Sequence, residues 1–486
     1  MKVFIETMGC QMNRLDSELL VGSLRAAGHE IVQDQWSADA VIYNTCSVRR
    51  HAEQKVLSRL GADGQRKASG RKLIVAVVGC MAQRMGESLR QQYPAVDIVC
   101  GPGRLYRLPE LLADAAAGGT RVALDPARNE PPDPAAEARM DELDLGRDPA
   151  SGAIPSQAFV RVMRGCDFFC SYCVVPFVRG PERSRSPDHI AQEVRRLVEA
   201  GRTEITLLGQ TVNSYNWSGG GRRVRFSDLL ERTRAVAGLR RLRFVTSHPI
   251  DFGDDVLQAM RDLPNVCPYI HVPAQSGSDA VLKRMNRRYT RARYDDLIDR
   301  ARAIVPGVVL AGDFIVGFPG ETEQDHAASA ELIRRCGYKN SFVFKYSPRP
   351  GTAAAERFKD DVPMEVKKRR NNELLAVQAE VGLAHHRRYV GRTVEVLVEG
   401  PSPRAGKQPR PAREGEVQLV GRTRGDHIVV FDGPPGLAGR YVDVRITDAT
   451  SLTLMGEGGH EPEGGTRPDT RHRDSSQPTN PSQPTN

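Results

Sequence analysis

Apolar runs alternate with helical patterns along the first part of the chain. The runs "VFIET", "DAVIYNT", "KLIVAVVG" and "VDIVCG" are each followed or separated by segments with helical spacing, such as "DSELLVGSLRAAG". Strands that alternate with helices form parallel α/β sheets. The pattern therefore predicts an N-terminal parallel α/β domain over residues 1–124.

A second alternating series follows over residues 155–388. Its candidate strands are "AFVRVM", "EITLLG", "LRFVTS", "YIHVP", "VVLAGDFIVG" and "SFVFKYS", and a charged helix over about 361–389 ends it. A closed eight-fold barrel needs roughly 250 residues, which do not fit here. We therefore expect a partial (β/α)6 barrel.

The texture changes again in the last part of the chain. Short β-rich runs ("TVEVLVEG", "EVQLVGRT", "HIVVFDG", "YVDVRITDAT") are broken by Gly and Pro, which predicts a small all-β barrel over residues 389–456. Residues 125–154 are rich in Pro, Asp and Ala and indicate a linker. Residues 457–486, with a repeated "QPTN", have the composition of a disordered tail.

Composition narrows the class of protein. The 486 residues are 40% apolar, with no run of roughly 18 uncharged apolar residues and no signal-peptide layout at the start, so we expect a cytoplasmic globular protein without membrane contact. Nine cysteines without a secretory signal favour metal or redox use over disulfides. The net charge of +9 is compatible with a polyanionic partner such as nucleic acid.

One cysteine cluster carries a strong chemical signal. "RGCDFFCSYC" spaces Cys166, Cys170 and Cys173 as C-x3-C-x2-C directly after a predicted strand. Three soft thiolates in one loop can hold an iron–sulfur cluster or a zinc ion and leave one ligand position open for catalysis. Zinc would need a fourth ligand, and none follows before His189. Three ordinary buried cysteines are the remaining alternative.

Three further cysteines each follow a predicted strand of the N-terminal domain. These are Cys10, Cys46 and Cys80, and the carboxyl ends of parallel strands meet at the edge where α/β sheets bind ligands. The three are thus expected to converge, although free Cys is also common in buried strands. Cys100 ends an apolar run too and is interpreted as packing. Cys267 and Cys336 are interpreted as core residues.

The cysteine loop resembles the signature of radical S-adenosylmethionine (SAM) enzymes, and "GDFIVGFPGETE" is similar to a strand and turn of that superfamily. The segments "ETMGCQMN", "YNTCSVR", "VVGCMAQ" and "PAQSGSDAVLKRMNRRY" resemble the methylthiotransferases within it. The resemblance implies a [4Fe-4S] cluster on Cys166, Cys170 and Cys173 that binds SAM. It also implies a second [4Fe-4S] cluster on Cys10, Cys46 and Cys80, and a TRAM-like RNA-binding domain at the C-terminal end.

Within the methylthiotransferases, "GCQMN" with "VVPFVRGPERSR" is similar to enzymes that convert N6-dimethylallyladenosine at tRNA position 37 to its 2-methylthio form. The resemblance implies SAM as methyl donor and radical source. It also implies tRNA, a sulfur donor and a flavodoxin- or ferredoxin-type electron donor as partners of a monomer. Alternatives are a methylthiotransferase for threonylcarbamoyl-adenosine or a ribosomal protein, a two-cluster electron carrier, and, in another class, a zinc-containing RNA-binding protein.

Further candidates are positioned less specifically by the sequence. Predicted strand ends and loops at the catalytic face of the barrel carry possible SAM contacts, although turn and capping residues would look the same: Tyr172, Gln210, Gln275, Ser276 and Asp313. His248 and His271 also follow strands and are expected to be structural. Basic segments carry possible phosphate contacts to RNA, or plain solvated charges: Arg422, Arg424 and Lys367.

Overall fold

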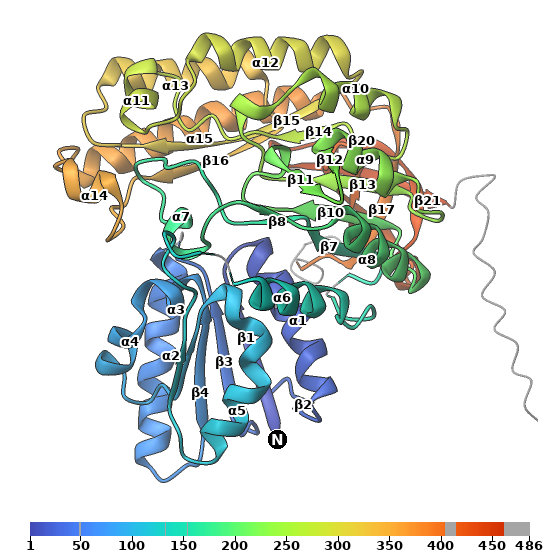
Figure 1. Cartoon of the computed structure of the whole chain (residues 1–486). Coiled ribbons are helices and arrows are strands. Elements are labelled where there is room, and N and C mark those ends of the chain that lie inside the picture. The colour runs from blue at the N-terminus through green and yellow to red at the C-terminus, as the bar shows by residue number, and fades with distance from the viewer. Residues whose placement is uncertain (48–49, 132, 153, 404–414, 461–486) are drawn as a thin grey trace, which may run out of the picture.

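The computed structural model describes residues 1–47, 50–131, 133–152, 154–403 and 415–460. These residues form an N-terminal α/β part, a partial α/β barrel and a small β-barrel, in chain order (Figure 1). From residue 461 onward, the predicted tail lies outside the described residues. No helix of the described residues is long and apolar enough to cross a membrane.

The N-terminal part is a six-stranded parallel sheet between helices. Its elements are β1 (Lys2–Met8), α1 (Gln11–Ala26), β2 (Glu30–Ile31), β3 (Ala40–Thr45), α2 (Arg50–Ala68), β4 (Ile74–Gly79), α3 (Cys80–Met85), α4 (Glu87–Gln92), β5 (Ile98–Cys100), η1 (Pro102–Arg107), α5 (Leu108–Ala116) and β6 (Arg121–Ala123). The strand order is β2-β1-β3-β4-β5-β6. Buried side chains of α1 and α5 pack on one face and those of α2 on the other. Burial on both faces explains why these strands are almost uniformly apolar.

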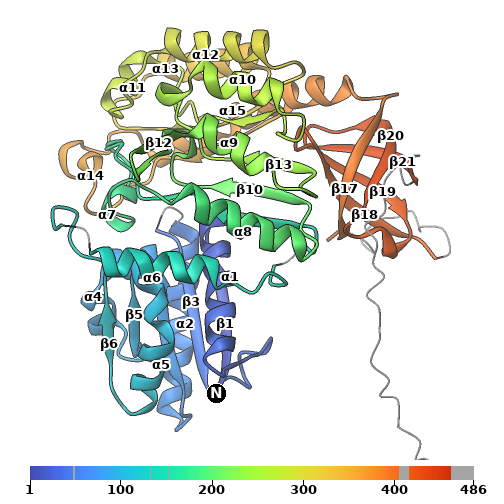
Figure 2. The ribbon, with the colours of Figure 1, turned by 45° about the vertical axis from the view of Figure 1, so that its right-hand side comes forward.

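The segment predicted as a linker contains a helix, α6 (Pro134–Leu145). Asp133 caps it by accepting hydrogen bonds from the backbone of Ala135 and Ala136, and Pro134 occupies the first turn, where its missing N–H costs nothing. Met140 and Leu143 of this helix pack into the same apolar core as the buried side chains of α1 and α5. Figure 2 shows α6 lying between the N-terminal sheet and the partial barrel.

The partial barrel contains the six predicted strands. Its main elements are β7 (Gln157–Arg161), α8 (Pro187–Glu199), β10 (Glu204–Leu208), α9 (Phe226–Arg234), β13 (Arg241–Phe244), α10 (Asp254–Asp262), β14 (Tyr269–His271), α12 (Arg291–Ile304), β15 (Val309–Val316), α13 (Glu323–Cys336), β16 (Asn340–Lys345) and α15 (Met364–Arg387). Short elements fill the loops: β8 (Met163–Arg164), α7 (Val175–Val178), β9 (Arg183–Ser184), η2 (Val212–Ser214), β11 (Asn216–Gly219), β12 (Arg222–Arg225), η3 (Pro249–Asp251), α11 (Asp279–Arg284) and α14 (Ala353–Arg357).

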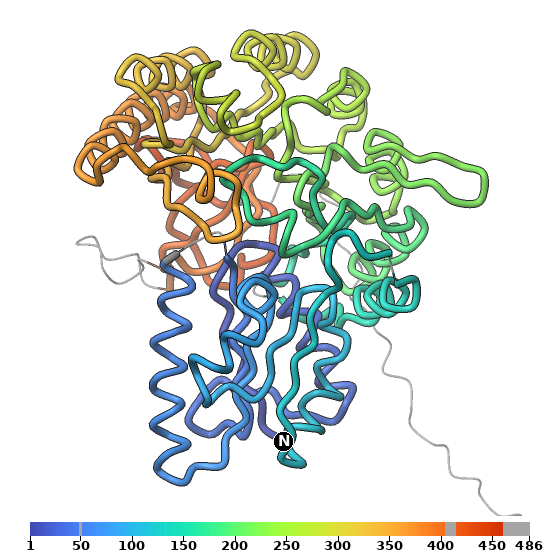
Figure 3. Tube along the Cα trace, turned by 60° about the vertical axis from the view of Figure 1, so that its left-hand side comes forward, coloured from blue at the N-terminus to red at the C-terminus, as the bar shows by residue number. Residues whose placement is uncertain are grey.

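These barrel strands run parallel in the orders β13-β10-β7 and β14-β15-β16. A parallel bridge between Leu242 and Val266 joins the two halves. The helices cover the outer face of the barrel sheet. Sheet and helices together form an arch above the N-terminal part (Figure 3). The predicted partial (β/α)6 barrel is confirmed.

The C-terminal part is a closed five-stranded barrel with the order β17-β18-β19-β21-β20. Its elements are β17 (Thr393–Pro401), β18 (Val417–Thr423), β19 (Ile428–Gly433), η4 (Pro435–Leu437), β20 (Tyr441–Ala449) and β21 (Thr453–His460). The sequence predicted four of these strands and missed β21, which extends past the expected boundary at residue 456. Glycines in β21 weaken the apolar pattern by which a strand is predicted from sequence. Close packing requires one of them, because a Cβ on Gly456 would lie 2.4 Å from Val444 Cγ1.

Candidate functional site

The loop after β8 gathers Cys166, Cys170 and Cys173, as predicted. Cys166 and Cys170 are each 8% exposed, and Cys173 is partly exposed. Burial raises the pKa of Cys173 to about 12, and the neighbouring Cys170 and Cys166 raise it as well. The three thiols therefore share one poorly solvated site, in which thiolate charge has to be balanced by a cation.

Contacts from the barrel supply that cation and fix the loop. Arg287 donates from Nη1 to Cys170 Sγ at 3.3 Å and from Nη2 to the Pro273 carbonyl at 3.2 Å. Thr211 Oγ1 lies 3.6 Å from Cys166 Sγ. The ring of His248 stacks on Phe168 with centroids 3.8 Å apart, and the structural role expected for this histidine stays a prediction.

The N-terminal sheet brings the other three cysteines to one edge. Met8 pairs with Thr45 and Thr45 with Gly79 in the sheet register, so Cys10, Cys46 and Cys80 all follow strand ends at the same level. A hydrogen bond with Cys46 is the main cause that lowers the pKa of Cys10 to about 6. The convergence predicted from the strand ends is present in the structure.

An asparagine network holds this edge in place. Asn13 accepts a hydrogen bond from the Cys10 backbone at 3.2 Å and donates to Asn44 Oδ1 at 2.9 Å. Asn44 in turn donates to the Asn13 carbonyl and to Ser17 Oγ, both at 2.9 Å. These amides are fully buried, so their donors and acceptors fix the start of α1, where Cys10 is the N-cap.

The N-terminal cysteine set contacts the chain segment that follows the other set. Cys80 packs with Val174 and Val178, and Val174 directly follows Cys173 in the chain. Arg179 donates from Nε to Cys80 Sγ at 3.2 Å and from Nη2 to Asp16 Oδ2 at 2.9 Å. Burial raises the pKa of Cys80, whereas the Arg179 guanidinium lowers it. Sequence reasoning assigned no role to Arg179, although the quoted "VVPFVRGPERSR" contains it.

The donor sets fit iron–sulfur chemistry better than a single ion. No three Cys, His, Asp or Glu side chains in the described part of the chain are arranged around one common metal position. In a [4Fe-4S] cluster each thiolate binds a different iron, so its ligands do not converge on one point. Three thiols, two of them buried in each set, with an arginine donor at each site are a suitable soft-ligand set for such a cluster.

The predicted SAM contacts divide into two groups. Tyr172, Gln275 and Asp313 form the first group: Tyr172 packs edge-on against Phe318, and the Gln275 backbone donates to the carbonyl of Asp313, which lies within β15, at 2.8 Å. The buried Oε1 of Gln210 accepts no hydrogen bond from the described residues. Ser276 is buried in a turn, where its Oγ accepts from the Ser278 backbone at 3.2 Å.

His271 reaches Asp313 across the strands, with Nε2 3.1 Å from Oδ1. Burial lowers the pKa of His271, whereas the Asp313 carboxylate raises it. The net result is a pKa above the usual value. This pair satisfies the histidine, as expected for a structural residue. It also leaves one face of Asp313 in the barrel interior.

The predicted RNA contacts are engaged inside the protein. Lys367 is 1% exposed and its ammonium binds Asp360 Oδ1 at 2.5 Å, so its expected surface position is wrong: the charge is buried and paired. Arg422 pairs with Glu399 and Asp426, each at 3.0 Å. Arg424 donates to the Val266 carbonyl at 3.1 Å. For both arginines, an RNA contact stays a prediction.

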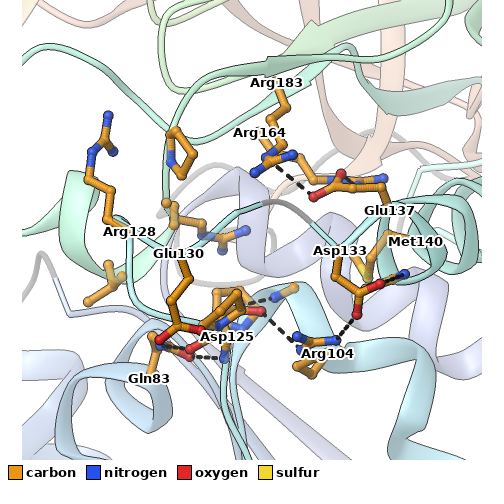
Figure 4. A pocket seen from close by; sticks show the side chains of 18 of the residues that line it. Gln83, Arg104, Asp125, Arg128, Glu130, Asp133, Glu137, Met140, Arg164 and Arg183 are labelled. Atoms are coloured by element: carbon orange, nitrogen blue, oxygen red, sulfur yellow. Dashed lines mark hydrogen bonds and ion pairs between the residues drawn. The ribbon is translucent and has the colours of Figure 1, made fainter.

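A solvent-open pocket, with about 850 Å³ of empty space that includes open solvent, is lined in part by Arg179, which donates to Cys80 (Figure 4). Its lining comes from the N-terminal part, from α6 and the segment before it, from β7 and β8, and from α7 and the loop after it, which contains Arg179. Charges in it are paired with one another, as Arg164 with Glu137 at 3.0 Å and Arg104 with Asp133 at 3.4 Å. The pocket thus lies where these parts of the chain meet, and charged side chains in its lining are paired.

Family models match each folded part. They are the uncharacterized protein family UPF0004 over residues 2–101, the radical SAM superfamily over residues 160–333 and the TRAM domain over residues 387–457. A solved structure of the radical SAM methyltransferase TsrM from Kitasatospora setae is similar in fold, with a TM-score of 0.52, 16% identity, and coverage of 71% of this chain and 72% of that one. The fold and the cysteine loop together define a radical SAM enzyme, a class that implies SAM and a [4Fe-4S] cluster.

Sequence comparison narrows this class. Curated proteins named tRNA-2-methylthio-N(6)-dimethylallyladenosine synthase are 48% identical in Rhodopirellula baltica, with coverage of 93% of this chain and 95% of that protein, and 44% identical in Bacteroides fragilis, with coverage of 94% and 95%. A third, from Clostridium botulinum, is 41% identical with coverage of 93% and 96%. The chain belongs to the family of tRNA-2-methylthio-N(6)-dimethylallyladenosine synthases.

Proposed function

We propose that this enzyme converts N6-dimethylallyladenosine at tRNA position 37, beside the anticodon, to 2-methylthio-N6-dimethylallyladenosine, with SAM as methyl donor and radical source. Family membership supports the reaction. The structural observation that carries it is the packing of Cys80 against Val174, the residue that follows Cys173. A transfer that uses both sites needs them adjacent.

In this proposal Cys166, Cys170 and Cys173 hold the SAM-binding [4Fe-4S] cluster, and Cys10, Cys46 and Cys80 hold a second one. Such a pair, with SAM, supplies radical chemistry and a transferable sulfur, which suits an adenine C2–H bond that is neither acidic nor attached to a leaving group. The protein contributes the ligands, the balancing cations Arg287 and Arg179, and burial that limits water at both sites.

The substrate and partners follow from the same assignment. Modification of a base requires that it leave the stack, so we propose that the anticodon loop presents the adenosine to the barrel mouth as a splayed nucleotide. The TRAM domain is proposed to bind the tRNA backbone. We further propose that the enzyme acts in the cytoplasm as a monomer, with a flavodoxin- or ferredoxin-type reductant and a separate sulfur donor.

Two measurements test the proposal. Anaerobic reconstitution of the full chain is expected to give about eight irons per chain, whereas about four or fewer would contradict the second cluster. Nucleoside analysis of tRNA from a deletion strain should show loss of the 2-methylthio-N6-dimethylallyladenosine pool. Loss of a methylthiolated threonylcarbamoyl-adenosine instead would assign the alternative substrate, and colourless protein with zinc would indicate an RNA-binding protein.

A further inference from the structure

Two exposed phenylalanines stand out on strand β16. Phe342 is 53% and Phe344 42% exposed, although both lie on a strand of the barrel sheet. Their rings are nearly parallel, at 20°, with centroids 6.3 Å apart. A large exposed apolar pair of this kind in a concave region is typical of a ligand-binding surface.

The sheet register shows which face the pair occupies. Phe342 pairs with Asp313 and Phe344 with Ile315, so these four side chains share one face. The alternate residues Phe314 and Val343 pack with the core that includes helices α13 and α15. Because those helices cover the outside of the barrel, Phe342 and Phe344 face its interior.

This interior face is continuous with the cysteine loop. Ile315, the partner of Phe344, packs in the same apolar cluster as Tyr172, which directly precedes Cys173. Beyond the end of β16, Arg349 lies 3.9 Å from Glu53 of the N-terminal part. Glu53 accepts a hydrogen bond from Ser47, the residue after Cys46. The strand thus lies beside the cluster that contains Tyr172, and the segment after it reaches the N-terminal part near Cys46.

We propose that Phe342 and Phe344 bind the N6-dimethylallyl group of the substrate adenosine, an inference that rests on the proposed function. The branched alkenyl group is an aliphatic substituent that an unmodified adenosine lacks. Two aromatic rings on a strand present a large apolar surface with little conformational entropy to lose. Binding there holds the adenine near both cysteine sets and discriminates against an unmodified adenosine.

The test uses the reconstituted full-length enzyme and two anticodon stem-loop RNAs, one with N6-dimethylallyladenosine and one with adenosine. Dissociation constants are measured for wild type, for Phe342→Ala/Phe344→Ala and for the conservative Phe342→Leu/Phe344→Leu. Leu375→Ala, an exposed apolar residue on α15, is the matched control. Iron content, thermal unfolding and SAM affinity verify that each variant is folded and loaded.

Wild type is expected to prefer the dimethylallyl RNA by at least about tenfold, since even one methylene in an apolar pocket gives such a factor. The double alanine variant should fall below about twofold, and the leucine and Leu375→Ala variants should keep most of the preference. An unchanged preference in the double alanine variant overturns the inference, as does absence of any preference in wild type. Weaker SAM binding with equal loss for both RNAs would assign the pair to SAM. Failure of the proposed function would show separately, as wild type that forms no 2-methylthio product.

Discussion

At the scale of single residues, each cysteine set combines thiols with one buried arginine. Arg287 donates to Cys170 and Arg179 to Cys80, at 3.3 and 3.2 Å. A guanidinium cannot lose its proton in a protein, so it is a permanent counter-charge for thiolates. The two arginines therefore favour the deprotonated state that iron ligation requires.

Cys10→Ala is expected to remove the N-terminal cluster and leave the other. Iron per chain should fall by about half, methylthio transfer should be lost, and SAM cleavage to 5′-deoxyadenosine should continue, because the second set lies in a different loop. Iron analysis and product chromatography measure both. Cys100→Ala is the matched control: Cys100 ends β5 in the apolar core, and its replacement should keep full iron content. Equal iron in wild type and Cys10→Ala would refute this ligand.

Lys367→Ala tests the corrected role of that lysine. Its ammonium binds Asp360 from a buried position, so truncation should destabilise the protein by roughly 1–3 kcal/mol and leave tRNA affinity unchanged. The neighbouring Lys368→Ala, whose side chain is 54% exposed, should alter neither stability nor fold. Denaturant unfolding and filter binding distinguish the outcomes. Reduced tRNA affinity with normal stability would restore the original prediction.

At the scale of elements, α6 connects the two cysteine-bearing parts. Asp144 binds Arg161 at 2.6 Å, and Arg161 binds Asp16 of α1 at 2.9 Å. All three side chains are almost fully buried. Burial opposes the charge of Asp144, yet the surrounding arginines hold its pKa below the usual range. The helix thus fixes the N-terminal sheet against β7, the strand that leads to the cysteine loop.

Asp144→Ala is expected to destabilise the protein by about 3–5 kcal/mol, because it leaves buried guanidinium groups of Arg161, Arg164 and Arg185 without a shared carboxylate. Glu142→Ala on the same helix, with a 72% exposed side chain, should cost under about 0.5 kcal/mol. Urea unfolding of both variants measures the difference. Similar midpoints would show that α6 is not a structural connector.

At the scale of the whole molecule, the C-terminal barrel docks through polar contacts. Lys339 binds Asp426 at 2.5 Å, and Arg243 donates to the carbonyl of Thr423 at 2.6 Å. Beside them, His385 of α15 lies with Nε2 2.9 Å from Nε2 of His427. Such a contact needs one protonated and one free nitrogen, so the ring that accepts the hydrogen bond must be neutral.

The histidine contact between α15 and the C-terminal barrel, called the joint below, predicts that the folded protein is less stable in acid. Burial, together with neighbouring charges, lowers the pKa of His385 and of His386 to about 4, and burial and Lys339 lower that of His427. The unfolded histidines titrate near 6.5, so the unfolded state binds more protons below that pH. Stability is therefore fully present above pH 6.5 and is lost as the pH falls toward 4. Calorimetry should show a loss on the order of 2 kcal/mol at pH 5 for His385 and a similar loss for His386.

His385→Gln is expected to reduce this pH dependence between pH 7.5 and 5, because it removes one titrating group from the joint. His189→Gln, at a half-exposed ring that lies 3.6 Å from Asp141 and far along the chain from the joint, is the control and should keep the wild-type profile. A wild-type stability that is flat over this range would contradict the neutral-histidine joint.

The amino-acid sequence alone predicts the three folded parts, the six barrel strands and the convergence of two cysteine triplets. The spacing of apolar residues in strands and helices can be read from neighbouring positions, and the carboxyl ends of parallel strands lie at one edge of a sheet. Long-range contacts decided the rest. Asp144 interrupts the apolar pattern of α6 and is stable only beside its arginines. Arg179 and Lys367 carry the same charge, yet only packing shows that one meets a thiol and the other is buried on Asp360. Likewise, only the register of β16 against β15 shows that Phe342 and Phe344 face the interior of the partial barrel.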